Sequence, residues 1–309
     1  MNIKNTTITV TGTVCALLLA GYGAHAQNLF VGSYGSQSLI EISGGTQTTF
    51  ATGLNYPTGL AFDSSGDLFE SDQFSGNIYE WAGAGTTRTT FVSDLNQPNY
   101  MAFNTAGDLF VSMDGTAIDE FNTKGSLINT ITTGLANATG IAFDSAGNMY
   151  VANDNGFGAT SGYVLKITTG GTESIYASGL NYPEGMAFNA SGDLYVCNGN
   201  PSSSIVEIKP GDVQSTFASD LNGPNCIAFN SAGDMFVADA GLYNIGGDIT
   251  EFDANGNVLG VDTSISNPVS LAFEGLALPV PEPSEYALFG LGAVALVVFS
   301  QKKKIAVRG

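Results

Sequence analysis

Hydrophobic residues occur along this chain in short runs, each bounded by glycine, asparagine, aspartate or proline. The runs are rich in Phe, Tyr, Ile, Val and Thr, a composition that favours β-strands over helices. No helical period appears between residues 28 and 278. The first full set of runs predicts strands at residues 59–62, 68–70, 77–81 and 86–93.

The same set of runs repeats with a period in the low forties. An Ala-Phe pair ends the first run of each copy, and its phenylalanine falls at Phe62, Phe103, Phe143, Phe188, Phe229 and Phe273. A Gly-containing segment follows, at 63–67 in the first copy, and predicts a tight hairpin turn. Four antiparallel strands in each unit of forty-odd residues is the layout of a β-propeller blade.

The two ends of the repeat region are complementary. Segments 28–34, 38–43 and 46–52 match the second, third and fourth strands of a copy and lack a first strand. Segment 267–274 matches a first strand and has nothing after it. The sequence therefore predicts an all-β, six-bladed propeller of about 24 strands in which the last strand completes the first blade, so that no sheet edge stays open at the join.

The repeat pattern resembles a known one. Pro-x-Gly-apolar-Ala-Phe followed by Gly-Asp-apolar-aromatic-Val is similar to the NHL repeat and to the gluconolactonase (SMP-30-like) six-bladed propellers, over residues 28 to about 276. The resemblance implies the fold. It says little about activity, because propellers carry many unrelated functions.

Residues 1–26 predict an export signal. Lys4 precedes an apolar core centred on residues 16–20, and Ala24-His25-Ala26 fits a small-x-small cleavage site. A permanent membrane anchor is the alternative, although the apolar core is short for one. Removal of the signal also removes His25, the only histidine, which excludes Ser-His-Asp and Cys-His nucleophile systems and histidine metal sites.

The predicted propeller, residues 27–278, is strongly acidic. It contains four basic residues against 26 acidic ones, a net charge of −22. Such a surface repels nucleic acid and anionic lipid and favours divalent cations or cationic partners; solubility outside the cell is the simpler explanation. Two cysteines remain, Cys197 and Cys226, and the sequence leaves open whether they form a disulfide or stay free thiols.

Residues 279–309 differ from the repeats. Val-Pro-Glu-Pro-Ser, with Pro281, Glu282 and Pro283, leads into an apolar run at 286–299 and then three lysines at 302–304. This order resembles the PEP-CTERM sorting signal of exosortase systems, with Lys in place of the usual Arg cluster and five further residues. The resemblance implies exosortase-type processing near 281–283, a transient inner-membrane intermediate, and delivery to the cell surface or extracellular polymer. An ordinary C-terminal anchor is the alternative.

The candidate site residues lie where the first strands of the blades are predicted to begin. Each first strand follows a corner usually marked by a proline, and the residue after this proline position is predicted to open onto one mouth of the central channel. Five of these residues are polar, namely Thr58, Asn99, Thr139, Glu184 and Asn225, and the sixth is Val269. An oxygen-lined ring of this kind could hold a hard cation such as Ca²⁺.

The family resemblance extends to this mouth. Gluconolactonase-like propellers hold a divalent metal with one Glu, two Asn and one Asp, which implies Glu184, Asn99 and Asn225 as ligands here. No aspartate matches clearly; the candidates, each expected to end a second strand, are Asp72, Asp114, Asp154 and Asp239, for which a structural role within the blade is the alternative. Tyr56 and Tyr182, before two corner prolines, could either present rings to sugars or pack between blades.

Two functions fit these features. The first is a non-catalytic propeller of the cell envelope or extracellular matrix that binds a polysaccharide or protein partner. The second is a metal-dependent hydrolase of lactones or related esters, in which Glu184, Asn99 and Asn225 hold the metal. We favour the first, because the predicted mature chain lacks a nucleophile system.

Overall fold

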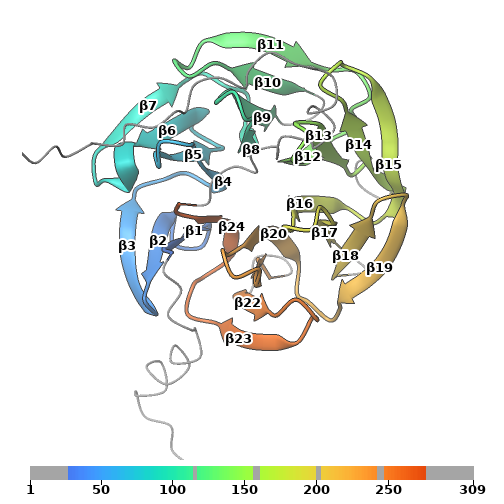
Figure 1. Ribbon diagram of the computed structural model, residues 1–309. Coiled ribbons are helices and arrows are strands. Elements are labelled where there is room, and N and C mark those ends of the chain that lie inside the picture. The colour runs from blue at the N-terminus through green and yellow to red at the C-terminus, as the bar shows by residue number, and fades with distance from the viewer. Residues whose placement is uncertain (1–26, 114–116, 156–160, 200–202, 242–246, 276–309) are drawn as a thin grey trace, which may run out of the picture.

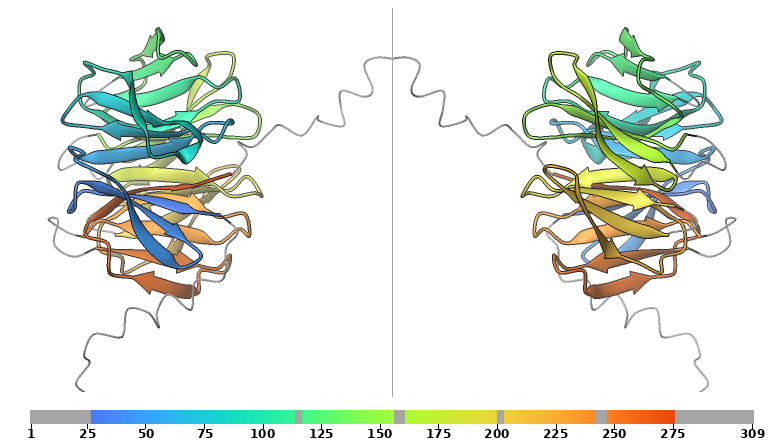
Figure 2. Two further views of the ribbon diagram at one scale, coloured as in Figure 1. Left: turned by 90° about the vertical axis from the view of Figure 1, so that its left-hand side faces the viewer. Right: turned by 90° about the vertical axis from the view of Figure 1, so that its right-hand side faces the viewer.

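The computed structural model describes residues 27–113, 117–155, 161–199, 203–241 and 247–275. These residues form 24 strands in six four-stranded antiparallel sheets, which surround a central axis (Figure 1). Seen from the side, the sheets make a thick disc (Figure 2). The predicted all-β, six-bladed propeller is confirmed, and the described residues contain only one short 3-10 turn, η2 (Ala82–Ala84).

Each blade contains four strands in sequence order from the axis outward, except that blade 1 takes its innermost strand from the C-terminal part of the chain. Blade 1 consists of β24 (Pro268–Phe273), β1 (Leu29–Ser33), β2 (Ser38–Ser43) and β3 (Thr46–Thr52). Blade 2 consists of β4 (Pro57–Phe62), β5 (Leu68–Asp72), β6 (Asn77–Trp81) and β7 (Arg88–Val92). Blade 3 consists of β8 (Pro98–Phe103), β9 (Leu109–Met113), β10 (Ile118–Phe121) and β11 (Leu127–Ile131).

The remaining three blades follow the same plan. Blade 4 consists of β12 (Ala138–Phe143), β13 (Met149–Asn153), β14 (Gly162–Ile167) and β15 (Glu173–Leu180). Blade 5 consists of β16 (Pro183–Phe188), β17 (Leu194–Asn198), β18 (Ser204–Lys209) and β19 (Val213–Ala218). Blade 6 consists of β20 (Pro224–Phe229), β21 (Met235–Asp239), β22 (Asp248–Phe252) and β23 (Val258–Asp262).

The ring is closed by the pairing of β1 with β24. The two strands are antiparallel, with Leu29 opposite Phe273. Beyond the strands, the Glu274 backbone N–H donates to the Asn28 carbonyl oxygen at 2.9 Å, and the Asn28 side-chain amide donates to the Glu274 carboxylate at 2.7 Å. The predicted completion of the first blade by the last strand is therefore confirmed.

The repeated phenylalanines join neighbouring blades. The phenylalanine that ends each first strand packs edge-to-face against an aromatic ring on the second strand of the preceding blade, with ring centroids 4.9–5.4 Å apart. This geometry suits the charge distribution of aromatic rings. The six pairs are Phe30–Phe62, Phe69–Phe103, Phe110–Phe143, Tyr150–Phe188, Tyr195–Phe229 and Phe236–Phe273. We call the end of the ring that carries them the Phe face.

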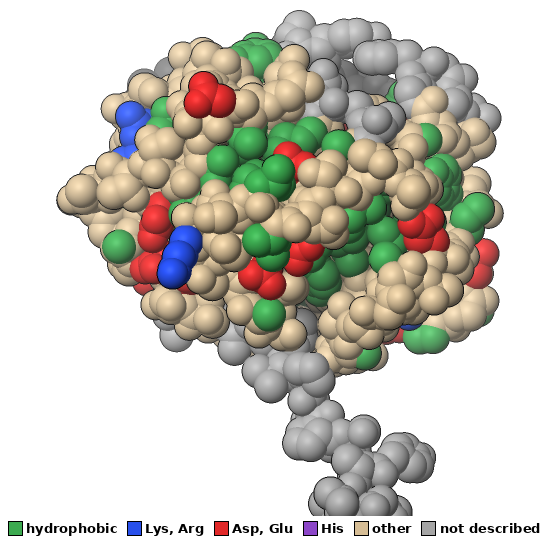
Figure 3. Space-filling view, turned by 90° about the horizontal axis from the view of Figure 1, so that it is seen from above, with side chains coloured by type: hydrophobic (Ala, Val, Ile, Leu, Met, Phe, Trp, Pro, Cys, Tyr) green, Lys and Arg blue, Asp and Glu red, His purple; other side chains and the backbone are tan. Residues whose placement is uncertain are grey.

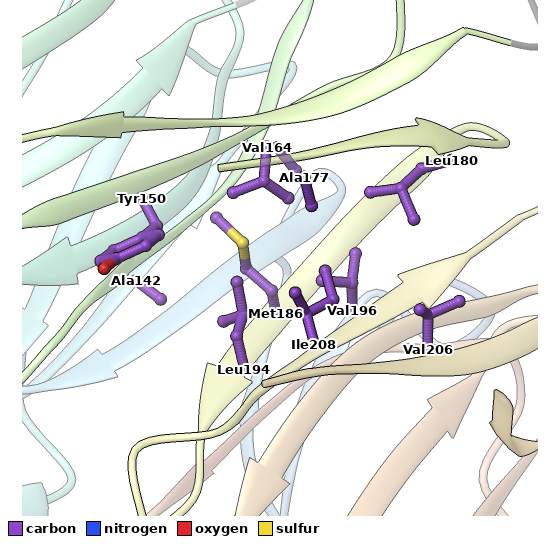
Figure 4. Close-up of a cluster of buried hydrophobic side chains, with 11 residues drawn as sticks. Ala142, Tyr150, Val164, Ala177, Leu180, Met186, Leu194, Val196, Val206 and Ile208 are labelled. Atoms are coloured by element: carbon purple, nitrogen blue, oxygen red, sulfur yellow. The ribbon is translucent and has the colours of Figure 1, made fainter. Parts of the chain in front are cut away.

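The hydrophobic core is divided among the six blade interfaces. Each cluster of buried apolar side chains combines residues of two adjacent blades. Between blades 4 and 5, for example, Val164 of β14 faces Met186 of β16 and Leu194 of β17 (Figure 4). Every blade therefore depends on both neighbours for its burial, which makes closure of the ring a condition of stability.

The predicted hairpin turns are also confirmed. The Asp63 carboxylate accepts hydrogen bonds from the backbone N–H groups of Ser65 and Asp67, at 2.8 and 2.9 Å. Gly66 has φ 86°, the left-handed conformation that glycine adopts without strain. These contacts give the Asp63 segment a structural role.

The predicted export signal, residues 1–26, lies outside the described residues, as does the predicted sorting segment with Pro281, Glu282 and Pro283. In the part of the chain that the structure describes, no helix is both long and apolar enough to cross a membrane.

Candidate functional site

The face opposite the Phe face is formed by the corners before the first strands and by the loops between second and third strands. We call it the corner face. The two kinds of loop are joined by backbone hydrogen bonds, such as that from the Gln73 N–H to the Tyr56 carbonyl oxygen at 3.0 Å. The six corner residues all have positive φ, between 41° and 87°: Tyr56, Gln97, Asn137, Tyr182, Gly223 and Asn267.

Near the axis, the innermost strands approach one another closely. A Cβ atom on Gly59 would lie 2.5 Å from the Asn99 carbonyl oxygen of the next blade, and one on Gly140 would lie 2.4 Å from that of Glu184. Glycine is needed at these positions because no other residue leaves room for the neighbouring backbone.

The six predicted mouth residues do not behave alike. Thr58 and Thr139 are buried, and their hydroxyls donate to the carbonyl oxygens of Pro98 and Pro183 in the next blade, at 3.2 and 2.7 Å. Val269 is buried as well. The other three residues, which are Asn99, Glu184 and Asn225, are partly accessible. The threonines therefore join blades, and three of the six residues can reach the mouth.

Tyr100, which the sequence analysis missed, links two of those three. It belongs to β8 of blade 3, and its hydroxyl lies 3.1 Å from Glu184 Oε2 in blade 5 and 2.9 Å from Asn225 Oδ1 in blade 6. The Asn225 carbonyl oxygen is 3.0 Å from the same hydroxyl. Blades 3 and 6 lie on opposite sides of the ring (Figure 1), so the tyrosine side chain spans the axis.

The electrostatics of this contact increase the protonated fraction of Glu184 near neutral pH. Burial raises the pKa of Glu184 to about 7, with a further upward contribution from the Asp154 charge; the Tyr100 hydrogen bond acts in the opposite direction. Part of the Glu184 surface is accessible from the mouth, yet protein atoms crowd the carboxyl from the other sides. Burial also raises the pKa of Tyr100 well above its ordinary range. Because a hydroxyl donates one hydrogen bond at a time, a protonated Glu184 carboxyl can supply the second proton of this cluster.

The residues at the mouth do not fit a resident cation in this arrangement. The Tyr100 oxygen stands between Glu184 and Asn225, where a metal shared by these two side chains would bind. Ca²⁺ needs six to eight oxygens at about 2.3–2.6 Å, and only one of the oxygens around this hydroxyl belongs to a carboxylate. No group of three or more His, Cys, Asp or Glu side chains in the described residues could hold a metal. The metal site therefore stays a prediction.

The aspartate candidates divide into two kinds. The Asp72 carboxylate accepts a hydrogen bond from the Asn55 backbone N–H at 2.8 Å, and Asp239 accepts one from the Asn222 backbone N–H at 2.5 Å. These contacts confirm the structural alternative for both residues.

Asp154 needs a correction, because it does not end a second strand. In blade 4 that position belongs to Asn153, whose side chain accepts from the Ala136 N–H at 2.9 Å. Asp154 lies one residue further along, accepts from the Asn137 amide at 2.6 Å, and raises the pKa of Glu184. Asp114 lies outside the described residues.

The hollows near the axis are unequal. Below Tyr100 the channel holds a cavity of about 90 Å³, bordered by Gly140, Gly185 and Cys226. On the Phe face, the Ala-Phe pairs enclose a pocket of about 290 Å³, and beside it a groove of about 1060 Å³ crosses blades 4 to 6. Cys197 and Cys226 are both free thiols. The cavity below Tyr100 is therefore the smallest of these three hollows.

Comparison with known proteins identifies the fold and no family. No family model matches the sequence, and no curated protein matches it. Among solved structures, a chain of a nidogen–laminin complex is 18% identical, with a TM-score of 0.70 over 80% of this chain and 98% of that one. A gluconolactonase of Xanthomonas campestris is 15% identical, with a TM-score of 0.63 over 79% and 87%. A catalytically inactive variant of virginiamycin B lyase from Staphylococcus aureus, with quinupristin, is 14% identical, with a TM-score of 0.57 over 78% and 86%. The structural neighbours thus include both binding proteins and enzymes.

Proposed function

We propose that this protein is an exported, non-catalytic propeller that binds a partner at the corner face, as a module of the cell envelope or extracellular matrix. The observation that carries the proposal is the position of Tyr100. Its hydroxyl fills the space between Glu184 and Asn225, where a gluconolactonase-like enzyme would need an open metal position for substrate.

The surface supports a binding role. The propeller carries a net charge of −22, and acidic side chains are spread over its edge with few basic ones among them (Figure 3). A partner with positive charge would be drawn to such a surface from a distance. The nidogen–laminin structure is a precedent for a similar fold in a protein complex.

Export and surface sorting belong to the same proposal. They depend on the sequence patterns at residues 1–26 and 279–309, including Pro281, Glu282 and Pro283. These patterns imply an exosortase-type protease as a transient partner and an inner-membrane intermediate. Replacement of Glu282 by alanine should leave the uncleaved chain in the membrane fraction, whereas normal release of this variant would count against the sorting signal.

The alternative function is hydrolysis of lactones or esters, favoured by the fold shared with gluconolactonases. The test is to titrate the purified protein with Ca²⁺, Mn²⁺ and Zn²⁺ in a calorimeter and to assay a panel of sugar lactones in each metal. We expect no stoichiometric metal uptake and no hydrolysis above the buffer rate. Metal-dependent hydrolysis that is lost in Glu184→Gln would overturn the proposal.

A further inference from the structure

Three aromatic rings lie together on the corner face, where blades 1 and 2 meet. Tyr34 follows β1, Tyr56 precedes β4, and Phe74 follows β5. The ring centroids of Tyr34 and Tyr56 are 3.9 Å apart, and those of Tyr56 and Phe74 are 4.7 Å apart. Phe74 is 57% exposed, and both tyrosines are partly exposed. We call these three side chains the aromatic ledge.

The corner does not need a tyrosine at position 56. Tyr56 has φ 78°, a conformation that bulky residues rarely adopt. Two other blades use Asn137 and Asn267 at the same corner, and asparagine tolerates positive φ. The tyrosine therefore keeps a strained backbone that a smaller residue would relieve, and such strain is commonly found at functional sites.

Among the described residues, the surroundings of the ledge carry carboxylates and no lysine or arginine. The pKa of the Tyr56 phenol is raised by burial first, and also by Tyr34 and by the Glu184 charge across the mouth. The described residues of the corner-face loops include no lysine or arginine, whereas four of these loops contain an aspartate there. These described parts span residues 33–38, 54–57, 72–77, 94–98, 113, 117–118, 135–138, 153–155, 161–162, 180–183, 198–199, 203–204, 221–224, 239–241, 247–248 and 265–268.

The basic residues of the propeller lie elsewhere and mostly have partners. All four belong to third or fourth strands or to the turns between them: Arg88, Lys124, Lys166 and Lys209. Arg88 stacks over the Tyr79 ring at 4.3 Å, Lys166 lies 3.6 Å from Asp144, and Lys209 lies 3.3 Å from Glu207. No cation of the chain's own described residues therefore compensates the charge around the ledge.

We propose that the aromatic ledge binds a lysine or arginine side chain presented by a partner polypeptide. A cation over the face of an aromatic ring is attracted by the electron density of the ring, and nearby carboxylates add to that attraction. A neutral sugar could stack on the rings and would gain nothing from the carboxylates, while an anionic polymer would be repelled. This inference rests on the proposed function, because it names the partner's chemistry at the corner face.

The test uses a fluorescent, acetylated Gly-Lys repeat peptide as the probe, with binding to the purified protein followed by anisotropy at physiological and at high salt. Tyr56→Asn should weaken binding about tenfold, because it removes the central ring. The same variant should stay folded, since asparagine suits this corner in two other blades. Tyr182→Asn, at a strained corner outside the ledge, is the matched control and should bind like the wild type.

Each outcome decides the proposal. Weaker binding in Tyr56→Asn and in Phe74→Ser, with Tyr182→Asn unchanged, supports it. Equal affinity in all variants, abolished by salt, would show a general polyanion effect and overturn it. Binding of an uncharged oligosaccharide that depends on Tyr56, without peptide binding, would overturn it as well. Neither negative result changes the outcome of the metal and lactone assays, which test the proposed function separately.

Discussion

The first strands end in the same residues in all six blades but begin with residues that differ from blade to blade. At the Phe face, all six blades use the same Ala-Phe ending and the same ring-to-ring contact with the preceding blade. At the corner face, the six blades place a different set of residues around the axis, and Tyr100 has no counterpart of its size. The residues that repeat in this chain therefore hold the ring together, whereas those that depart from the repeat are where function should be sought.

The largest expected effect is on the free energy of unfolding and concerns the Ala-Phe ends of the first strands at the Phe face. Phe273→Ala removes a ring that packs on Phe236 at the interface between blades 1 and 6, where Phe273 is only 4% exposed. We expect a loss of about 3–5 kcal/mol in the free energy of unfolding, measured with urea, because a buried aromatic ring is replaced by a cavity. Phe74→Ala, which removes an exposed ring, is the control and should change it by less than about 0.5 kcal/mol. Similar losses in both variants would contradict a structural role for the repeated pair.

Glu70 departs from the repeat inside blade 2, and we expect it to lower the free energy of unfolding. Glu70 is fully buried in β5, and neither carboxylate oxygen accepts a hydrogen bond from the described residues. The other five blades have valine at this position: Val31, Val111, Val151, Val196 and Val237. Glu70→Val should therefore raise the free energy of unfolding by about 1–3 kcal/mol, measured with urea.

The pH dependence of that gain is a second check. Burial, followed by the Asp72 charge, raises the pKa of Glu70 well above its usual value, and Arg88 acts against this. A raised pKa in the folded state means that the stabilising contribution is complete below the unfolded pKa and is lost as pH rises. The gain from Glu70→Val should accordingly be larger at pH 8 than at pH 4. A gain that does not change with pH would contradict a buried, neutral carboxyl.

Glu184 should also make the folded protein less stable as pH rises, by a smaller amount than Glu70. Its pKa rises from an ordinary 4.5 to about 7 in the folded protein, so its contribution is full below pH 4.5 and declines up to about pH 7. Glu184→Gln should remove this decline, which we put at about 1–2 kcal/mol after allowing for its partial access to solvent. Urea unfolding from pH 4 to pH 8 measures it. A steeper decline in the variant than in the wild type would contradict this assignment.

The smallest effect on stability is expected at the corner of blade 5, where Tyr182 has a strained backbone. Tyr182 has φ 41°, and asparagine occupies the equivalent corner in two blades. Tyr182→Asn should change the thermal midpoint by a few degrees at most, since relief of backbone strain and loss of a partly buried side chain oppose each other. A drop of more than about 10 °C would show that this tyrosine carries blade packing and is not interchangeable.

The fold could be predicted largely from the sequence because the same pattern of strands and turns occurs in six copies. Segments 38–43, 46–52 and 77–81 match β2, β3 and β6 to the residue. The first strand of blade 2 begins two residues earlier than predicted, since Pro57 already pairs with Asp72. The closing blade followed from counting strands, which needs no side-chain detail.

The mouth was harder to predict because its contacts cross the ring. Tyr100 reaches a blade more than a hundred residues away, and no local pattern reports such a contact. A signal existed in the alignment of the repeats, where the equivalent positions hold Gly59, Gly140, Gly185, Cys226 and Ser270. A large side chain among small ones marks the residue that can fill the centre. Asp154 was misplaced for a different and local reason: Asn153 ends the second strand of this blade, so the aspartate lies one residue beyond the expected position.

The central claim is that Tyr100 closes the corner-face mouth in the place where a cation would otherwise bind. The most direct measurement is a crystal structure of the protein grown in millimolar calcium chloride. We predict that the Tyr100 hydroxyl stays within hydrogen-bonding distance of Glu184 and Asn225 in that structure. A cation held by Glu184, Asn99 and Asn225, with the tyrosine ring turned out of the axis, would contradict the account.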